Sequence, residues 1–454
     1  MTRALAALLL LLSSAGCGST PPPDPPPDPE PQTRDTAGAE DPLADVPGRP
    51  PTAPEARAMR RLARVAESLR SLRFEHEVPI RVQDRETITS FVRDQIDAEE
   101  LERARIFYVA IGLLDPDLAV DELIVRVLGE QIVGYYDPDQ SLLVVREDVA
   151  AELGGAPGRA RELGEAEMVI VHELVHALQD QRLGLGQRYE EERTIDGENA
   201  FAALVEGDAT LAMIGHMVSQ QGQPLSNLTR NAGLLRMMIR NAPDAIQGQE
   251  IENAPPIIRL PLVSRYLDGL VFCATLHGGA GWNGVDSAHR HLPVSTEQVL
   301  HPERYLAGEL PDEVTLPPLP SLEQAGLVPH EEDSLGELEL SIWFGLGSPT
   351  EDRLESPAEG WGGDRLRVYR DGSGGTAVVW FTTWDDEGEA TEAATAARAV
   401  TAALTAGGGE APYVEQQGRA VLVLMNVPQA QKPAVRAAFD AFVAELPAST
   451  PHGD

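Results

Sequence analysis

Apolar residues recur at helical spacing through most of the N-terminal part of the chain. Leu62, Val65 and Leu69 belong to the first such stripe, which begins near Glu55. Apolar positions three and four residues apart predict amphipathic helices, and glycine, proline and aspartate clusters separate one helix from the next. We predict further helices over residues 86–98, 99–114, 117–129, 159–182, 197–220, 226–241 and 258–280.

Strand-like runs interrupt this helical pattern. Residues 77–82 predict one strand. Residues 131–136 and 141–145 are apolar runs on either side of a short Asp-Pro-Asp-Gln turn, which is the pattern of a β-hairpin. Gln131–Tyr136 or Ser141–Val145 could bind an extended peptide as an added strand. The other interpretation is a plain hairpin within the core.

The pattern changes towards the C-terminus. Residues 309–333 include an acidic, proline-rich stretch, which predicts a linker, and a helix is expected over 335–346. The fold class expected is α+β: a mainly helical, zincin-like domain with a small sheet over residues 56–308, then a small β-β-α-β-β-α domain over 334–447. The elements of this second domain are expected at 365–370, 376–383, 387–406, 413–415, 419–425 and 431–446.

The N-terminus has the features of an export signal. Residues 1–17 contain an early arginine, an apolar run too short to span a bilayer, and small residues. Ser14-Ala15-Gly16-Cys17 resembles the bacterial lipobox, although Ser14 stands where leucine is preferred. We expect lipidation at Cys17, with simple secretion as the alternative. Residues 18–55 hold thirteen prolines and predict an extended, disordered stalk.

Composition limits the partners and the covalent chemistry. The chain has 454 residues and a net charge of -36, which disfavours nucleic acid as a direct partner. Membrane contact is expected through the lipid anchor alone, in the bacterial cell envelope, on its periplasmic or outer surface. With Cys17 lipidated, Cys273 has no partner for a disulfide, and its apolar neighbours indicate a buried thiol.

The sequence His172-Glu173-Leu174-Val175-His176 carries the clearest chemistry. Residues four apart share one face of a helix, so His172 and His176 can direct their imidazoles at one ion. Zinc favours such nitrogen ligands and, in catalytic sites, leaves a position for water. Glu173 can accept a proton from that water as it attacks a carbonyl group. The surrounding residues are apolar, so a chance match would leave three polar groups in a buried helix.

One zinc ion needs a third protein ligand. Glu206, among apolar residues on the next long helix, is the best candidate, because a buried acidic residue is usually paired or ligating. A glutamate from a second helix is the gluzincin arrangement, the class that includes thermolysin. Competing ligands are Glu198, Asp196 and Asp208. Asp180 and Asp208 are also expected behind the ligands, where they could orient a ligand or join the two helices.

A donor to the oxyanion of the transition state is also expected. The candidates are His301 and Tyr266, followed by His277, His289 and His291. Glu297 lies four residues before His301 and could pair with it. Three tryptophans of the C-terminal domain predict core packing, with a glycan or peptide surface as the alternative: Trp361, Trp380 and Trp384.

The segments around these residues resemble a family of predicted bacterial zinc metallopeptidases that are often lipoproteins. The similarity lies in His172–Gln181 and Leu204–Ala209, and extends to Val133–Pro138, Ser295–Tyr305 and Gly360–Arg365. It spans about residues 60 to 446, so both domains are included. The resemblance implies that His172, His176 and Glu206 bind zinc and that Glu173 is the general base.

The sequence therefore predicts an exported, lipid-anchored zinc peptidase, most simply an endopeptidase acting on peptides or proteins. Two other hypotheses remain open. One is a catalytically silent binding or chaperone module of the envelope that keeps the fold. The other is an amidase of cell-wall peptides, which would use the same site.

Overall fold

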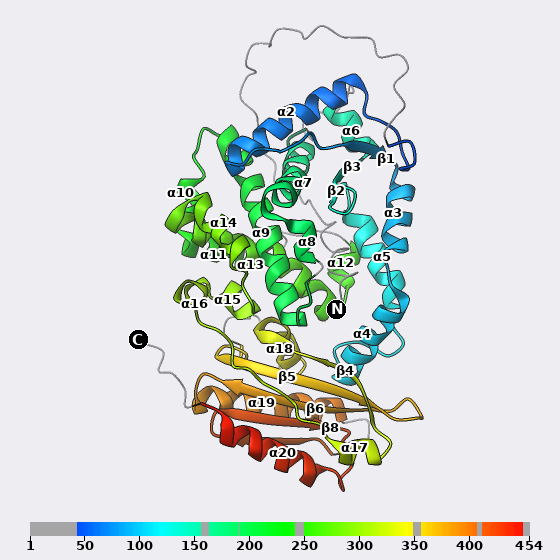
Figure 1. The fold of residues 1–454 in the computed structure, drawn as a ribbon, viewed down its shortest axis with the longest axis vertical. Coiled ribbons are helices and arrows are strands. Elements are labelled where there is room, and N and C mark those ends of the chain that lie inside the picture. The colour runs from blue at the N-terminus through cyan, green and yellow to red at the C-terminus, as the bar shows by residue number, and fades with distance from the viewer. Residues whose placement is uncertain are drawn as a thin grey trace.

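The computed structural model describes residues 43–155, 163–189, 191–240, 249–347, 356–405 and 411–447. The fold is mixed α+β, as the order of predicted elements indicated. A helical body with a small sheet lies against a C-terminal domain built on a second sheet (Figure 1). The predicted signal sequence, Cys17 and the first part of the stalk lie outside the described residues.

The long helices of the body match the predicted ones closely, whereas the predicted helix 226–241 is divided. Asn231 accepts a hydrogen bond from the amide of Leu234 (3.1 Å) and so starts a new helix. The shortest helices were not predicted, because a few residues give no apolar stripe. The helices of the body are α2 (Ala53–Arg70), α3 (Arg85–Asp94), α4 (Ala98–Ala110), α5 (Val120–Gln131), α6 (Glu147–Leu153), α7 (Leu163–Leu183), α8 (Leu185–Tyr189), α9 (Ile195–Gln220), α10 (Ser226–Thr229), α11 (Ala232–Arg240), α12 (Gln249–Asn253), α13 (Pro256–Ala280), α14 (Trp282–Arg290), α15 (Thr296–Leu300) and α16 (Pro302–Ala307).

The sheet of the body has three strands in the order β1-β3-β2, with β1 (Ile80–Gln83), β2 (Gly134–Asp137) and β3 (Leu142–Arg146). The predicted hairpin is β2 and β3, paired antiparallel. β3 also pairs with β1, so it has no free edge, and the hypothesis that Ser141–Val145 adds a peptide strand is wrong. β2 pairs only with β3 among the described strands and is an edge strand.

The last residues of the predicted stalk pack on the body. Arg49 forms a β-bridge with Val82, and the side-chain amide of Gln83 donates to the carbonyl of Pro47 (2.9 Å). Arg49 also forms an ion pair with Glu55 at the start of α2 (2.8 Å). Residues 43–52 are therefore part of the folded body, which begins earlier than the predicted boundary at residue 56.

The C-terminal domain contains the predicted β-β-α-β-β-α order, preceded by one further strand and two helices. Its antiparallel sheet has the order β4-β5-β6-β8-β7. Residues 309–333 are more than a linker, because they include β4, and Val314, Leu316 and Leu319 are buried against the sheet. The elements are α17 (Pro320–Gln324), β4 (Val328–Asp333), α18 (Gly336–Gly345), β5 (Trp361–Arg370), β6 (Thr376–Trp384), α19 (Glu387–Thr405), β7 (Tyr413–Gln417), β8 (Ala420–Met425) and α20 (Lys432–Glu445).

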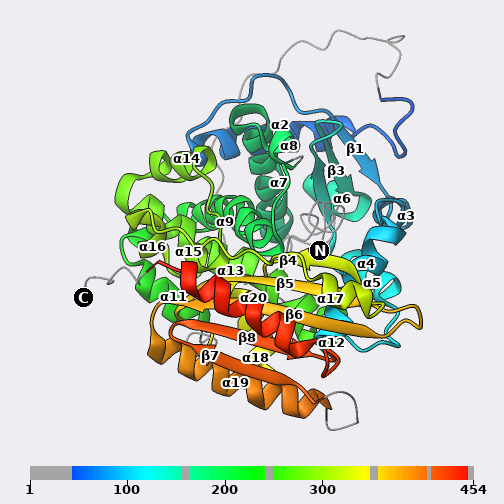
Figure 2. The same ribbon diagram turned by 60° about the horizontal axis from the view of Figure 1, so that its bottom comes forward.

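Helices cover both faces of this sheet (Figure 2), and alternate residues of its strands pack against different layers. Val379 and Phe381 of β6 pack against α20, whereas Val378 and Trp380 face α18 and α19. Trp361, Trp380 and Trp384 are each 1% exposed. The prediction of core packing is confirmed for them, and a glycan or peptide surface made of these rings is excluded.

The two domains meet where α9 begins. The amide of Ile195 donates to Asp333 (2.8 Å), and the amide of Asp196 donates to the carbonyl of Ser334 (3.1 Å). Gly336 has a φ of 71°, and a Cβ atom there would lie 1.8 Å from the Asp196 carboxylate. The position of α9 is therefore set partly by the C-terminal domain.

Helix α9 is the one described helix that is long and apolar enough for a membrane span. Its most apolar stretch is 78% buried inside the protein, and its residues contact α7 and α13. It is accordingly a core helix of the body.

Candidate metal centre

Helix α7 carries the two histidines. It ends before Gly184, whose φ of 72° suits the left-handed turn that terminates many helices. His172 and His176 are one turn apart, and their Nε2 atoms approach to 3.0 Å. Two imidazole nitrogens are therefore directed at one point in the interior.

Helix α9 brings a carboxylate to the same point. The Thr194 hydroxyl caps its first turn by accepting from the amide of Gly197 (3.1 Å). Three turns further along, an oxygen of Glu206 lies 3.0 Å from the Nε2 atom of His172 and 3.7 Å from that of His176. All three side chains are buried. The predicted two-helix cluster is present in the structure.

The spacing of these atoms fits zinc. Tetrahedral coordination with bonds of about 2.0–2.1 Å places ligand atoms about 3.3 Å apart. The three observed separations are 3.0, 3.0 and 3.7 Å. Two imidazoles and one carboxylate are also a ligand set that catalytic zinc sites use.

The charges of the cluster also favour a cation. Burial opposes the ionised form of Glu206, but the neighbouring imidazoles of His176 and His172 hold its pKa below the usual value. Burial likewise opposes the charged form of His176, yet Glu206 raises the pKa of that imidazole to about 9. A positive charge placed among these groups is therefore stabilised.

Gln179 orients His176, a role that was not predicted from the sequence. Its side-chain nitrogen donates to the carbonyl of Val205 (3.0 Å), which can only accept, so its oxygen must face the Nδ1 atom of His176 (2.9 Å). With a metal ion in place of its second proton, His176 would keep the proton on Nδ1 and present the lone pair of Nε2 to the ion. Its spacing, three residues after His176 on an apolar helix, was the available signal.

Asp208 lies behind the candidate ligands. This position agrees with the predicted supporting role and not with the predicted role as third ligand. It accepts hydrogen bonds from Gln179 (3.0 Å), Arg70 (2.6 Å) and His289 (2.9 Å). Burial would raise the pKa of Asp208, but the Arg70 guanidinium and His289 hold it well below its usual range. Asp208 is therefore an anion held by these three groups, and it supports His176 through Gln179.

The remaining competitors for the third ligand lie elsewhere. Asp196 accepts hydrogen bonds from the amide and hydroxyl of Thr296 (2.8 and 2.5 Å). Burial raises the pKa of Asp196 to about 8, in spite of those bonds. Glu198 lies 3.6 Å from Arg193. Among the described residues, Glu206 is the acidic side chain that joins the two histidines.

Glu173 faces the edge strand of the body. One of its oxygens accepts from the amide of Tyr136 in β2 (3.0 Å). The amide of Arg146 in β3 donates to Val133, so the alternate positions Gly134 and Tyr136 direct their backbone groups away from β3. The edge of β2 that does not pair with β3 thus lies beside the candidate base.

Asp180 joins different elements from those expected. It accepts from the Tyr136 hydroxyl (2.6 Å) and from the amide of Gly186 (3.0 Å). The prediction that it orients a ligand or joins the two ligand-bearing helices is wrong. Asp180 instead fastens α7 to β2 and to α8, because its side chain lies one turn beyond His176 on the side that faces them.

Of the predicted oxyanion donors, Tyr266 is the one that the structure places beside the candidate metal ligands. Its ring lies over that of His172, with centroids 6.1 Å apart. Its hydroxyl is buried and has no hydrogen-bond partner within the described part of the chain. Burial, followed by the charges of Glu206 and Glu173, raises its pKa well above the usual value, so the hydroxyl keeps its proton.

The histidines proposed for the same task are engaged elsewhere. His301 bonds Glu337 of α18 (3.0 Å), and Glu297 pairs with Arg304 (2.9 Å), not with His301. The expectation of an oxyanion donor at His301 is wrong, because α18 buries it at the domain junction. The other three have these partners: His277 with Thr229, His289 with Asp208 and His291 with the carbonyl of Ser287.

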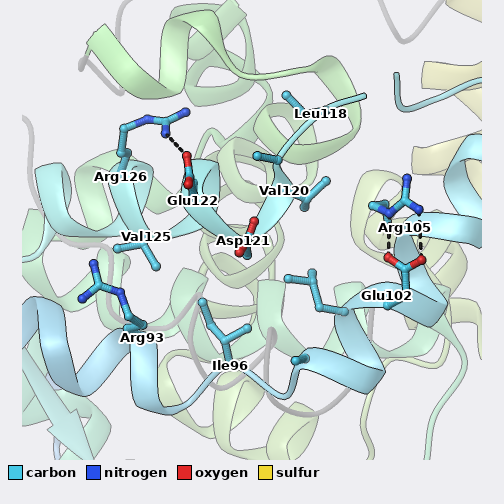
Figure 3. Close-up of a pocket in the computed structure, with 13 residues that line it drawn as sticks. Arg93, Ile96, Glu102, Arg105, Leu118, Val120, Asp121, Glu122, Val125 and Arg126 are labelled. Atoms are coloured by element: carbon cyan, nitrogen blue, oxygen red, sulfur yellow. Dashed lines mark hydrogen bonds and ion pairs between the residues drawn. The ribbon is translucent and has the colours of Figure 1, made fainter. Parts of the chain in front are cut away.

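Two further features resemble sites. Glu297, Glu309 and Asp385 also lie close together, but Arg304 bonds or pairs with all three and supplies their positive charge. A hollow of about 740 Å³ lies between α3, α4 and α5 (Figure 3). Its lining contains no histidine, and two of its arginines pair with glutamates in the same wall.

Comparison with known proteins adds one match. Residues 325–436 match the family model of a domain of unknown function, DUF8575. The match covers most of the C-terminal domain and none of the three candidate ligands. No curated protein and no solved structure matches the chain.

Proposed function

We propose that the chain is a zinc-dependent peptidase of the gluzincin type, acting on internal bonds of peptides or proteins. The observation that supports this most strongly is the convergence of His172, His176 and Glu206 on one point, with Glu173 beside it. The ligand residues come from two helices distant in sequence. A chance occurrence of the histidine motif would not require such a third partner.

Each residue then has a distinct task. Zinc held by the three ligands would polarise a peptide carbonyl and lower the pKa of water. Glu173 accepts the proton of the attacking water, with its carboxylate oriented by the amide of Tyr136. The protonated hydroxyl of Tyr266 donates to the carbonyl oxygen as negative charge develops there. The edge of β2 that does not pair with β3 is the candidate strand for binding the peptide in extended form.

Metal analysis tests this proposal directly. The purified chain should contain about one zinc ion per molecule, and it should hydrolyse a mixed peptide substrate. A chelator should abolish hydrolysis, and added zinc should restore it. A chain that binds no zinc would refute the proposal. Zinc without hydrolysis of peptides or cell-wall peptides would favour the silent binding module.

We also propose that the protein is exported and anchored by a lipid at Cys17. The export signal and lipobox-like sequence support this, and a proline-rich stretch separates them from the folded body. Cys17→Ser should move the protein from the membrane fraction to the soluble fraction of bacterial cells. Unchanged membrane fractionation of that variant would contradict the anchor.

A further inference from the structure

Arg265 is a buried cation with unused hydrogen-bonding groups. It lies on α13 and is only 2% exposed. Its Nη2 atom donates to the side-chain oxygen of Asn199 (3.0 Å). Its Nε and Nη1 atoms have no hydrogen-bond partner among the residues that the structure describes. Burial of such donors without acceptors is costly, so each instance in a folded protein calls for an explanation.

The contact between α9 and α13 places Arg265 near the candidate metal centre. A Cβ atom on Gly207 would lie 2.1 Å from the backbone oxygen of Gly269, so the two helices touch there. Gly207 follows Glu206, and Arg265 lies about one turn before Gly269. Burial lowers the pKa of Arg265, and the nearby charges of Glu198 and Glu206 oppose that shift.

Other groups near Arg265 are also without partners. The hydroxyl of Tyr189 on α8 is buried and makes no hydrogen bond to any described residue. The charges of Glu206 and Arg265 both act on that hydroxyl. The second oxygen of Glu206 is buried without a hydrogen bond, and the carboxylate of Glu198 also acts on Arg265 and Tyr189, against the unpaired donors of Arg265, Tyr189 and Tyr266. The surplus of donors calls for a ligand that supplies acceptor oxygens.

The C-terminal domain holds Arg265 in place. Asn199 accepts from Arg265 through its oxygen and donates through its nitrogen to Glu339 of α18 (3.1 Å). Glu339 also accepts from the hydroxyl of Tyr108 (2.9 Å). This chain of bonds fixes one nitrogen of the guanidinium and leaves the other two for a ligand. Glu339 belongs to the segment that matches the domain of unknown function.

We propose that Arg265, together with Tyr189, binds an acceptor oxygen of the peptide substrate beside the candidate metal centre. This inference rests on the proposed peptidase function. The oxygen belongs either to the terminal carboxylate of the peptide or to a main-chain carbonyl group. Both accept hydrogen bonds from a guanidinium, and a carboxylate also neutralises its charge.

Peptide capture by a slow variant tests the assignment. Zinc-loaded Glu173→Gln protein is incubated with a mixed-sequence peptide library, once as free acids and once as C-terminal amides. The peptides retained are quantified by mass spectrometry. Adding Arg265→Met should weaken retention about 10- to 100-fold, the range expected for hydrogen bonds to a charged group. Arg265→Lys should recover part of the loss.

Arg193→Met is the matched control. Arg193 also lies near Tyr189 and Glu198, but it has Glu191 as a hydrogen-bond partner (2.8 Å). Its replacement removes the same charge and should leave peptide retention within about 2-fold, a change of about 0.4 kcal/mol. Zinc content and thermal unfolding of every variant show whether the fold and metal centre remain.

The library results separate the two sources of the oxygen. Loss confined to free acids assigns Arg265 to the terminal carboxylate, whereas equal loss with the amides assigns it to a main-chain carbonyl. Equal retention with and without Arg265, including no retention by either protein, overturns the proposal. Zinc binding by the parent protein would still stand in that case, so failure of this inference is distinct from failure of the peptidase.

Discussion

Glu173→Gln should bind zinc as the parent protein does and hydrolyse peptides about 10²- to 10⁴-fold more slowly. The amide has nearly the same shape as the carboxylate, and its oxygen can still accept from the amide of Tyr136. It cannot take up a proton from water. Glu173 is not among the three atoms that converge on the candidate zinc position, so the metal should remain. The measurements are zinc content and initial rates.

Glu167→Gln is the matched control for this prediction. Glu167 lies on the same helix but bonds Arg61, and it lies 3.5 Å from His216. Its replacement should leave the rate of hydrolysis within a few-fold of the parent. An unchanged rate in Glu173→Gln would place the general base elsewhere. Loss of zinc from that variant would make Glu173 a ligand instead.

Glu206→Ala is expected to abolish stoichiometric zinc binding, whereas Asp208→Asn should retain the metal. Both residues are fully buried acids on α9, two positions apart. Glu206 points at the histidines, and Asp208 points at Arg70, Gln179 and His289. Removing one of three protein ligands leaves two imidazoles, which hold zinc weakly in competition with water. Elemental analysis after dialysis measures the difference.

Asparagine is chosen at position 208 because its amide oxygen can still accept from the buried guanidinium of Arg70, whereas alanine would leave that donor without its acceptor. Gln179→Leu supplies an intermediate case. It removes the acceptor for the Nδ1 proton of His176, and zinc affinity should fall about 10- to 100-fold. Zinc retained by Glu206→Ala and lost from Asp208→Asn would transfer the ligand role to Asp208.

The site residues that could be predicted from the sequence are those whose roles follow from spacing along a single helix. His172 and His176 follow from the helical repeat, and Glu206 follows from a lone acid on an apolar helix. Gln179 had the same kind of signal. Arg70 and Arg265 had none, because their partners lie more than a hundred and more than sixty positions away, respectively.

The errors have a related cause. His301 looked available because α18, which supplies Glu337, could not be positioned from the sequence. Residues 309–333 looked like a linker because they include an acidic, proline-rich stretch, yet Val314, Leu316 and Leu319 fill the outer face of the sheet. In both cases tertiary packing determines the surroundings of the residues, and the local sequence pattern does not predict that packing.

The contact between Gly207 and Gly269 limits how this protein can change over time. Backbone meets backbone there, so no smaller residue exists that could compensate for a larger one on the other helix. Helix α9 carries Glu206, and α13 carries Tyr266 and Arg265. The distance between these groups therefore cannot change gradually through small substitutions. Such gradual change is possible where leucine and valine side chains form the contact between two helices. Descendants of this sequence must keep the pair of glycines or rebuild both helices together.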